Sequence, residues 1–421
     1  MLDLDNAASR LAMILTSLLI AGFSILPETI GSYLIYAVLL IGTILLKTKG
    51  KVNLSLEPFY LLQMIMIAFT ACSMIWAEVP YWTSIKVRQL TVNLFFSAIL
   101  YIAYSNEKDI WPLIRCFKWA GYIVAAYLIR YYGFNRLISM LLDATRMTGE
   151  VANANQLGMC IAFGCLFEIL EMAHFKKFSF SWPFIIPCIL IISATQSRKA
   201  ILILVIGIVL VFFFYYFSLE QFTRSIVSLL IFIFITSVII YIFKTLPVFS
   251  GVYSRMEYLF NFVKGEGETG ISVESRSKMI EAGWLQFLKT PVLGIGIGNA
   301  GLAGQIIGIQ DFWAYLHNNY IELLCGGGIV GFSIYYAKYI YASVKLIQGR
   351  QQLGNLFFPC LIICIIKLVL DYGLVSYFEK QHEMHFLLLF LSIKYFNKTN
   401  ISDEQLQSPL NRRKYIKGDS L

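Results

Sequence analysis

The residues best suited to chemistry stand at the start of a long apolar stretch in the C-terminal third of the chain. His317 and Asn318 precede this stretch, Glu322 lies just inside it, and a glycine-rich segment at 291–298 comes shortly before. An imidazole with amide and carboxyl groups at the mouth of an apolar segment is costly in lipid and well placed to meet a polar substrate. Because imidazole exchanges protons near pH 7, His317 is a candidate reactive group. A structural hydrogen-bonding role for this histidine is the alternative.

Two further groups place cations at helix starts. Arg198 and Lys199 stand side by side in a tight turn between two apolar stretches, and guanidinium groups bind phosphate through paired hydrogen bonds. Arg276 and Lys278 lie in the first turn of an expected helix, where free backbone N–H groups favour anions. The alternatives are lipid-facing anchors for the first pair and ordinary surface charges for the second.

A fourth polar segment precedes the apolar stretch that begins near residue 153. It contains Arg146, Asn153 and Asn155. Arg146 and Asn155 are candidate substrate-binding residues. A helix cap with an interfacial arginine explains the same pattern, so this segment alone does not establish a site.

The signals for metal or cofactor chemistry are weaker, and we predict neither. The glycines of 291–298 lack the spacing, the preceding strand and the lysine of a nucleotide loop, so we interpret them as flexible backbone near a site. His382 and His385 share one helical face, but an interfacial role is favoured over metal binding. Lys367 and Asp371, one helical turn apart, are expected to neutralise each other.

Membrane helices must position these residues. The 421-residue chain is 58% hydrophobic and only 14% charged, which is too apolar for a soluble core. The apolar runs are continuous over roughly 15–25 residues, as in helices and unlike the alternating strands of a membrane barrel. We predict an all-α integral membrane protein with about twelve transmembrane helices. The expected spans are 11–26, 30–46, 57–76, 89–104, 111–130, 153–173, 182–196, 200–218, 225–243, 317–344, 353–371 and 384–396.

The distribution of Lys and Arg in the short loops predicts the orientation of these spans. With both termini in the cytoplasm, the inner loops and the tail hold most of the cations, namely Lys47, Lys49, Lys51, Lys108, Arg115, Lys118, Lys176, Lys177, Arg224, Lys345, Arg350, Arg412, Arg413 and Lys414. The net charge of +9 therefore indicates membrane topology and not nucleic-acid binding. The eight cysteines all lie in apolar spans and imply no disulfide framework.

We divide the chain into four parts: helices 1–9 in residues 1–243, a large external loop at 244–316 that contains short helices, helices 10–12 in 317–396, and a cytoplasmic tail at 397–421. One helix within the loop is predicted from its amphipathic pattern. Its apolar positions recur at helical spacing from Ile280 to Leu288, Glu274 lies near its start, and Pro291 follows its end. This helix is expected to lie on the bundle or at the lipid headgroups.

Several motifs occur in a fixed order along these elements. They are Arg146, Gly149 and Asn155; Arg198 with Leu202 four residues later; Arg276 before the turn from Pro291 to Gly296; and His317-Asn318, the nine residues from Asn319 to Gly327, and Gly328-Ile-Val-Gly331. Together they resemble the O-antigen ligase and polymerase superfamily, in which a large external loop occurs late in a multi-spanning chain. The resemblance extends over about residues 140–371.

The resemblance implies metal-independent transfer of a glycan from undecaprenyl diphosphate to an acceptor hydroxyl on the outer face of the bacterial cytoplasmic membrane. Arg198 and Arg276 would stabilise the leaving diphosphate, and His317 would be the general base. Asn318 or Glu322 would orient His317. Substrate-binding roles would fall to Arg146, Asn155, Lys199, Lys278, Asn318 and Glu322.

Three functions remain open at this point. A polymerase of O-antigen, capsule or exopolysaccharide is favoured over a ligase that moves finished glycan to lipid A core. A lipid-linked oligosaccharide flippase is the third, but flippases tend to have paired repeats and polar residues along a path, whereas these polar residues gather at one face. The expected partners are the lipid-linked glycan, an acceptor glycan or glycolipid, the lipid bilayer and other polysaccharide-assembly membrane proteins, and no nucleic acid.

Overall fold

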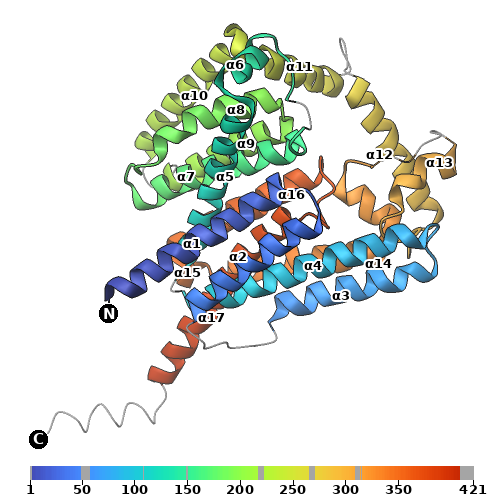
Figure 1. The fold of residues 1–421 in the computed structure, drawn as a ribbon, viewed down its shortest axis with the longest axis horizontal. Helices are drawn as coiled ribbons and strands as arrows, with labels where there is room; N and C mark the ends of the chain where they lie inside the picture. The colour runs from blue at the N-terminus through green and yellow to red at the C-terminus, as the bar shows by residue number, and fades with distance from the viewer. Residues whose placement is uncertain are drawn as a thin grey trace, which may run out of the picture.

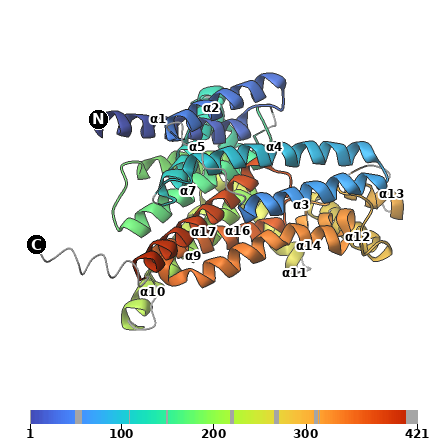
Figure 2. The same cartoon turned by 90° about the horizontal axis from the view of Figure 1, so that it is seen from below.

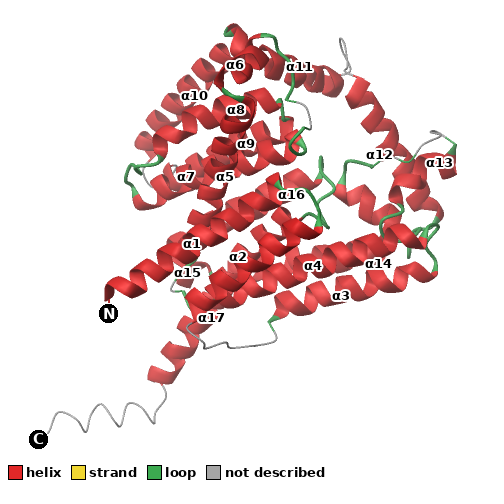
Figure 3. Cartoon of the chain, in the orientation of Figure 1, coloured by secondary structure: helices red, strands yellow, loops and turns green. Residues whose placement is uncertain are grey.

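The regular structure of the protein is helical throughout its described part. A computed structural model describes residues 2–48, 57–107, 109–147, 150–216, 222–264, 271–308, 313 and 315–407, and none of them lies in a strand (Figure 3). Within these ranges, nine helices are long and apolar enough to cross a bilayer. They are α1 (Leu2–Ile25), α2 (Ile30–Thr48), α3 (Pro58–Cys72), α4 (Pro80–Tyr104), α5 (Trp111–Tyr132), α7 (Ala154–Phe175), α9 (Arg198–Tyr216), α10 (Phe222–Thr245) and α14 (Asn319–Gln348).

The other three expected spans also coincide with helices, but these do not meet the same criteria. The helix α8 (Ile185–Thr195) has 11 residues and α16 (Phe357–Asp371) has 15, which is short for a 30 Å hydrocarbon layer. The helix α17 (Lys380–Gln407) is long enough, but its ends are rich in charged and polar residues. The all-α class is therefore confirmed, whereas the count of twelve crossings stays a prediction.

An error in helix bounds that bears on buried polar residues concerns α4, which begins at Pro80 and not near residue 89. Pro80 follows the extended residue Val79 and suits the first turn of a helix, where its missing N–H leaves no hydrogen bond unmade. The charged residues Lys86 and Arg88 lower the mean hydropathy of this part of the helix, so a hydropathy criterion does not detect it. Inside the protein, Lys86 is buried and donates to Gln89 Oε1 at 3.1 Å.

Helix packing in the N-terminal half relies on small residues. A Cβ atom added to Gly121 on α5 would lie 2.8 Å from the Cα atom of Gly164 on α7. Glycine is therefore required at this crossing, where the two backbones touch, as is common between membrane helices. Around it, the helices α1, α5, α7 and α9, labelled in Figure 1, contribute side chains to one continuous apolar core.

Three helices occupy the segment between α10 and α14. They are α11 (Ser250–Lys264), α12 (Ile271–Lys289) and α13 (Ala303–Ile307). The helix α11 packs against α6 (Phe134–Leu142), α8, α9 and α10, as Figure 1 shows, and α12 lies near the end of α14 in Figures 1 and 2. The amphipathic helix expected around 274–288 is thus confirmed as α12, whereas α6, α11 and α13 were not predicted.

The side of α12 that is buried differs from the side that the sequence pattern predicts. Its buried side consists of Met279, Ala282 and Gln286, while Trp284 and Leu288 are exposed. Because an exposed tryptophan and leucine on one side of a helix suit the membrane interface, α12 can pack on the bundle and face lipid headgroups at the same time.

The glycine-rich segment at 291–298 is packed and not flexible. Gly294, Gly296 and Gly298 all have positive φ angles, and a Cβ atom at Gly294 would lie 2.5 Å from the carbonyl oxygen of Cys325. The segment joins α14 through a backbone hydrogen bond from Ile295 N to the same carbonyl at 3.0 Å. These glycines therefore permit tight backbone packing against α14, which corrects the expectation of a mobile loop.

Candidate active site

The turn between α8 and α9 presents Arg198 at the first position of a helix. Gln196 ends α8 in the left-handed conformation, with φ of 49°, and Ser197 is fully buried. The Ser197 hydroxyl accepts from the backbone N–H of Ala200 at 3.4 Å, as a helix-capping residue does. Arg198 and Lys199 are both partly buried. The turn thus sets two cations at a helix start, where the backbone itself favours an anion.

Arg146 connects this turn to the start of α7. Its Nε atom donates to the carbonyl of Thr195 at 3.2 Å, and one terminal nitrogen donates to Asn155 Oδ1 at 3.1 Å. Asn153 caps α7 by accepting from the backbone N–H of Asn155 at 2.9 Å. The structure therefore brings Arg146 and Asn155 together as expected, and it also bears out helix capping, by Asn153. Gly149, the other residue of this motif, lies outside the described residues.

A further arginine, Arg255 on α11, joins the same turn. It donates to the carbonyl of Gln196 at 3.2 Å. The close approach of α11 depends on Gly251, where an added Cβ atom would lie 2.5 Å from Gln196 Nε2. The Gln196 side chain in turn donates to the carbonyl of Ala144 at 2.8 Å. The sequence reasoning missed Arg255, because the helix that carries it was not predicted.

Arg276 is directed to the site by the packing of α12 on α14. An added Cβ atom at Gly283 would lie 2.4 Å from a methyl group of Leu316 and 2.7 Å from one of Ile321. Arg276 lies two helical turns before Gly283 on the same side of α12, and it is close enough to His317 for their charges to interact. Lys278 is exposed. Because it lies two positions after Arg276 in the helix, it faces a different side from Arg276.

We call Arg146, Arg198, Arg255 and Arg276 the arginine cluster. Each of the last three lies near enough to other members for like charges to repel. Burial, followed by repulsion from the other three arginines, lowers the pKa of Arg255 to about 10. Four guanidinium groups from four separate segments thus converge on one place, and this concentration of positive charge favours the binding of an anion.

His317 lies beside the arginine cluster in an unusual backbone conformation. Its φ angle is 56°, in the left-handed region that few residues other than glycine adopt. Its side chain is partly buried. Burial, together with the positive charges of Arg276 and Lys199, lowers the pKa of its imidazole to about 4. His317 is therefore neutral at pH 7 and able to accept a proton.

Asn318 and Glu322 do not orient His317 in the structure. Asn318 caps α14, with its Oδ1 atom accepting from the backbone N–H of Ile321 at 3.1 Å. The buried Glu322 accepts from the backbone N–H of Leu316 at 3.3 Å and interacts with Lys86. Both side chains thus hold the backbone on either side of His317, and their predicted roles are corrected from orienting the imidazole to shaping its loop.

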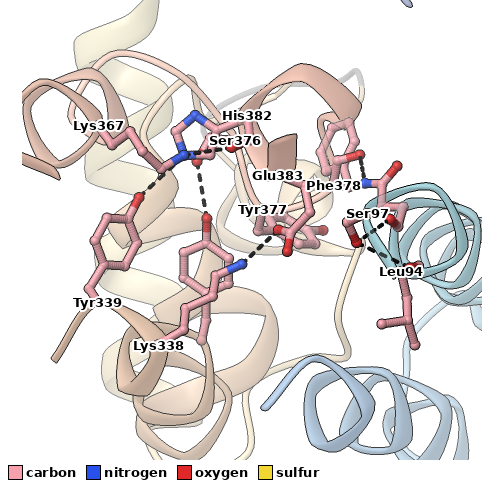
Figure 4. Close-up of polar contacts among 12 residues, drawn as sticks. Leu94, Ser97, Lys338, Tyr339, Lys367, Ser376, Tyr377, Phe378, His382 and Glu383 are labelled. Carbon is pink, nitrogen blue, oxygen red and sulfur yellow. Dashed lines mark hydrogen bonds and ion pairs between the residues drawn. The ribbon is translucent and has the colours of Figure 1, made fainter. Parts of the chain in front are cut away.

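A second group of charges lies inside the bundle between α14, α16 and α17. We call Lys338, Lys367, Asp371, His382 and Glu383 the bundle network, and Figure 4 shows Lys338, Lys367, His382 and Glu383. Lys338 Nζ donates to Glu383 Oε2 at 2.9 Å, and Lys367 Nζ donates to the His382 carbonyl at 2.7 Å.

The bundle network agrees with one sequence-based expectation and corrects another. The charges of Lys367 and Asp371 interact as expected, and Asp371 also accepts from the hydroxyls of Tyr336 and Tyr339 at 3.0 and 2.9 Å. The interfacial role expected for His382 and His385 is wrong, because both are buried. His385 packs on Phe163 with 4.1 Å between ring centroids. In the described part of the chain, no three His, Cys, Asp or Glu side chains are arranged to hold a metal ion.

Comparison with known proteins adds one finding to this geometry. Residues 183–336 match the family profile described as O-antigen ligase, a range that includes Arg198, Arg255, Arg276 and His317. No curated protein matches the chain. Arg146 and Asn155 lie before the matched range, so only the structure connects them to it. The match supports the resemblance to the O-antigen ligase and polymerase superfamily over residues 183–336, and the nine long apolar helices of the described residues indicate a membrane protein.

Proposed function

We propose that this protein transfers an oligosaccharide from undecaprenyl diphosphate to an acceptor hydroxyl on the outer face of the bacterial cytoplasmic membrane. The single observation that supports this most strongly is the arginine cluster beside His317. A lipid-linked diphosphate carries the negative charge that four converging guanidinium groups require, and paired hydrogen bonds from guanidinium suit its oxygens.

The proposed reaction is a direct substitution at the sugar. The acceptor oxygen attacks the anomeric carbon of the donor glycan, and the bond from that carbon to the diphosphate oxygen breaks. The acceptor proton passes to His317, while undecaprenyl diphosphate leaves with the bonding electron pair. Arg198 and Arg276 stabilise the negative charge that grows on the leaving diphosphate, as fixed cations can do without a metal.

The low pKa of His317 has a consequence for this mechanism. An imidazole with a pKa of about 4 is neutral but only weakly basic, because the positive charges of Arg276 and Lys199 oppose its protonation. A bound diphosphate compensates those charges and raises the basicity of His317. Binding of the donor therefore makes His317 a stronger base for the proton transfer.

Within the superfamily, we favour a polymerase over a ligase. Our reason is that the run from His317 to Leu324 resembles the polymerase branch, and a ligase that acts on lipid A core is the second candidate. Nothing in the structure or the comparisons favours a flippase.

A reconstituted assay tests the proposal. Purified protein receives only a lipid-diphosphate-linked repeat unit, and products are separated by length. A polymerase extends the glycan under these conditions, whereas a ligase acts only after lipid A core is added. Absence of transfer under both conditions would contradict the proposal.

A further inference from the structure

A pocket of about 360 Å³ lies beside the candidate site and has no role in the account so far. It opens where the connection from α1 to α2 meets α4, the start of α7 and the connection from α16 to α17. Its volume falls in the range of roughly 300–1,000 Å³ that is typical of small-molecule sites. We call it the polar pocket, and its polar lining includes Glu28, Gln89, Asn153, Gln156, Glu379 and Lys380.

The lining combines hydrogen-bonding groups of both kinds with aromatic surface. Gln156 Nε2 donates to Glu379 Oε2 at 2.7 Å, and Lys380 pairs with Glu28. Amide side chains both donate and accept, which matches hydroxyl groups that do the same. Phe23 and Phe378 add flat apolar surface to the wall. This combination suits a sugar ring, which has hydroxyls around its edge and C–H groups on its faces.

The charges of the polar pocket contrast with those of the arginine cluster. Glu28 and Glu379 are accompanied by Lys380 and by Lys86, which interacts with both carboxylates. Carboxylates that face the pocket repel a phosphate, whereas hydroxyls hydrogen-bond to carboxylates readily. The pocket is thus suited to an uncharged polyhydroxy ligand and not to a diphosphate.

Two connections place the polar pocket next to the arginine cluster. Asn153 lines the pocket and caps the helix whose Asn155 accepts from Arg146. Glu379 lines the pocket and interacts electrostatically with Lys199, the neighbour of Arg198 in sequence. A glycan attached to, or attacking, a sugar diphosphate held by the arginines would therefore reach the pocket.

We infer that the polar pocket is a carbohydrate-binding subsite that holds a sugar ring of one glycan substrate through Gln89, Gln156 and Glu379. The assignment of the ligand to the glycan of the transfer reaction rests on the proposed function. The shared chemistry, a polyhydroxy ring, is common to the donor and the acceptor.

Saturation-transfer NMR on the full-length protein in detergent micelles tests binding without turnover. The probes are the uncharged methyl glycosides of hexoses, 6-deoxyhexoses and N-acetylhexosamines. At least one should give a saturable signal, and Gln89→Ala and Gln156→Ala should each weaken its affinity about fivefold, the loss expected for one hydrogen bond of about 1 kcal/mol. Absence of a saturable signal from every glycoside would overturn the inference.

Matched controls separate the polar pocket from its surroundings. Arg88→Ala changes an exposed residue next to Gln89 on the same helix and should leave glycoside affinity unchanged. Arg198→Ala should also leave it unchanged, because the arginine cluster lies outside the pocket. Equal loss of affinity in the Arg88 and Gln89 variants would overturn the inference.

Kinetics of the reconstituted reaction then identify the glycan. In the Gln156→Ala variant, a raised KM for the acceptor assigns the polar pocket to the acceptor, and a raised KM for the donor assigns it to the donor. Active protein with neither KM raised would reject the subsite while leaving the proposed function intact. Glycoside binding by a protein that shows no transfer would reject the proposed function while leaving the subsite intact.

Discussion

The arginine cluster and the bundle network both collect cations in a membrane protein, but they neutralise them differently. In the bundle network, Lys338 donates to Glu383 and Lys367 to a backbone carbonyl. In the arginine cluster, the guanidinium groups repel one another, and that repulsion contributes to the lowered pKa of Arg255. A network that contains its own anions stabilises the fold, whereas a cluster of like charges is suited to an anion from outside.

The two regions also differ in how they are assembled. The bundle network comes from three helices, α14, α16 and α17, that pack in the core of the bundle. The arginine cluster draws on the segment before α7, the start of α9, and the helices α11 and α12. The geometry of the arginine cluster therefore depends on how α11 and α12 pack against the rest of the protein.

The largest expected effect in this comparison comes from His317. Replacement by alanine removes the proton acceptor, and turnover should fall roughly 10²–10⁴-fold while lipid-linked donor still binds. Single-turnover transfer and donor binding are the measurements. If His317→Gln, which keeps a donor and an acceptor, restores normal turnover, the histidine only supports its loop.

Substitutions in the arginine cluster should have the next largest effect on turnover. Arg198→Lys keeps the charge but loses the planar pair of donors, and Arg276→Ala loses both, so each should lower turnover by about 10²–10³-fold at unchanged expression. Glycan chain length in cells and transfer by purified protein both report on this. Near-normal polymer in the Arg198→Lys strain would make Arg198 a lipid-facing anchor.

Thermal stability should change in opposite directions in the two regions. Glu383→Gln leaves the buried ammonium of Lys338 without its counter-ion and should cost about 3–5 kcal/mol. Arg255→Gln keeps a donor for the Gln196 carbonyl and removes one repelling charge, so the melting temperature should rise. Melting curves in detergent provide the test, and a fall in both variants would show that the arginine cluster is also self-neutralised.

The pH dependence should reveal the interaction between His317 and the bound donor. Protonation of the imidazole abolishes its function as a base, so kcat/KM should be level from neutral pH downward and fall as pH passes through about 4. With diphosphate bound, the pKa rises, and the acid limb of kcat should lie at higher pH than that of kcat/KM. Coincident limbs would contradict the electrostatic link.

Much of the fold could be predicted from the sequence because lipid requires long apolar helices. Each expected span coincides with a helix, and α12 was found from its periodicity. Helix starts that contain polar residues were harder to predict, because Lys86 and Arg88 lie within α4 but lower its hydropathy. Positions of helices were thus predictable, whereas their ends required knowledge of buried polar partners.

The candidate site was predictable in part. Arg198, Arg276 and His317 stood out by residue type and motif, and the structure places Arg276 within electrostatic reach of both Arg198 and His317. Arg255 could not be found, because its position depends on the contact of Gly251 with Gln196, a tertiary feature with no local pattern. An arginine in an amphipathic stretch near the start of the loop was the only available signal.

The glycine-rich segment shows a second limit. The glycines at 291–298 led to the prediction of flexible backbone, whereas Gly294, Gly296 and Gly298 have positive φ angles in a packed segment. Whether a glycine-rich backbone moves or packs depends on what surrounds it, and here Gly294 meets the backbone of α14. The sequence therefore identified the segment but not its packing.

The central claim is that the arginine cluster binds the diphosphate of the donor, and the affinity of the purified protein for inorganic pyrophosphate tests it most directly. Calorimetric titration should give saturable binding that Arg276→Gln and Arg255→Gln each weaken about 10–100-fold, as expected for loss of a hydrogen bond between charged groups. Glu383→Gln, which alters only the bundle network, should bind as the wild type does. Absence of binding by the wild-type protein, or equal affinities in all four proteins, would contradict the account.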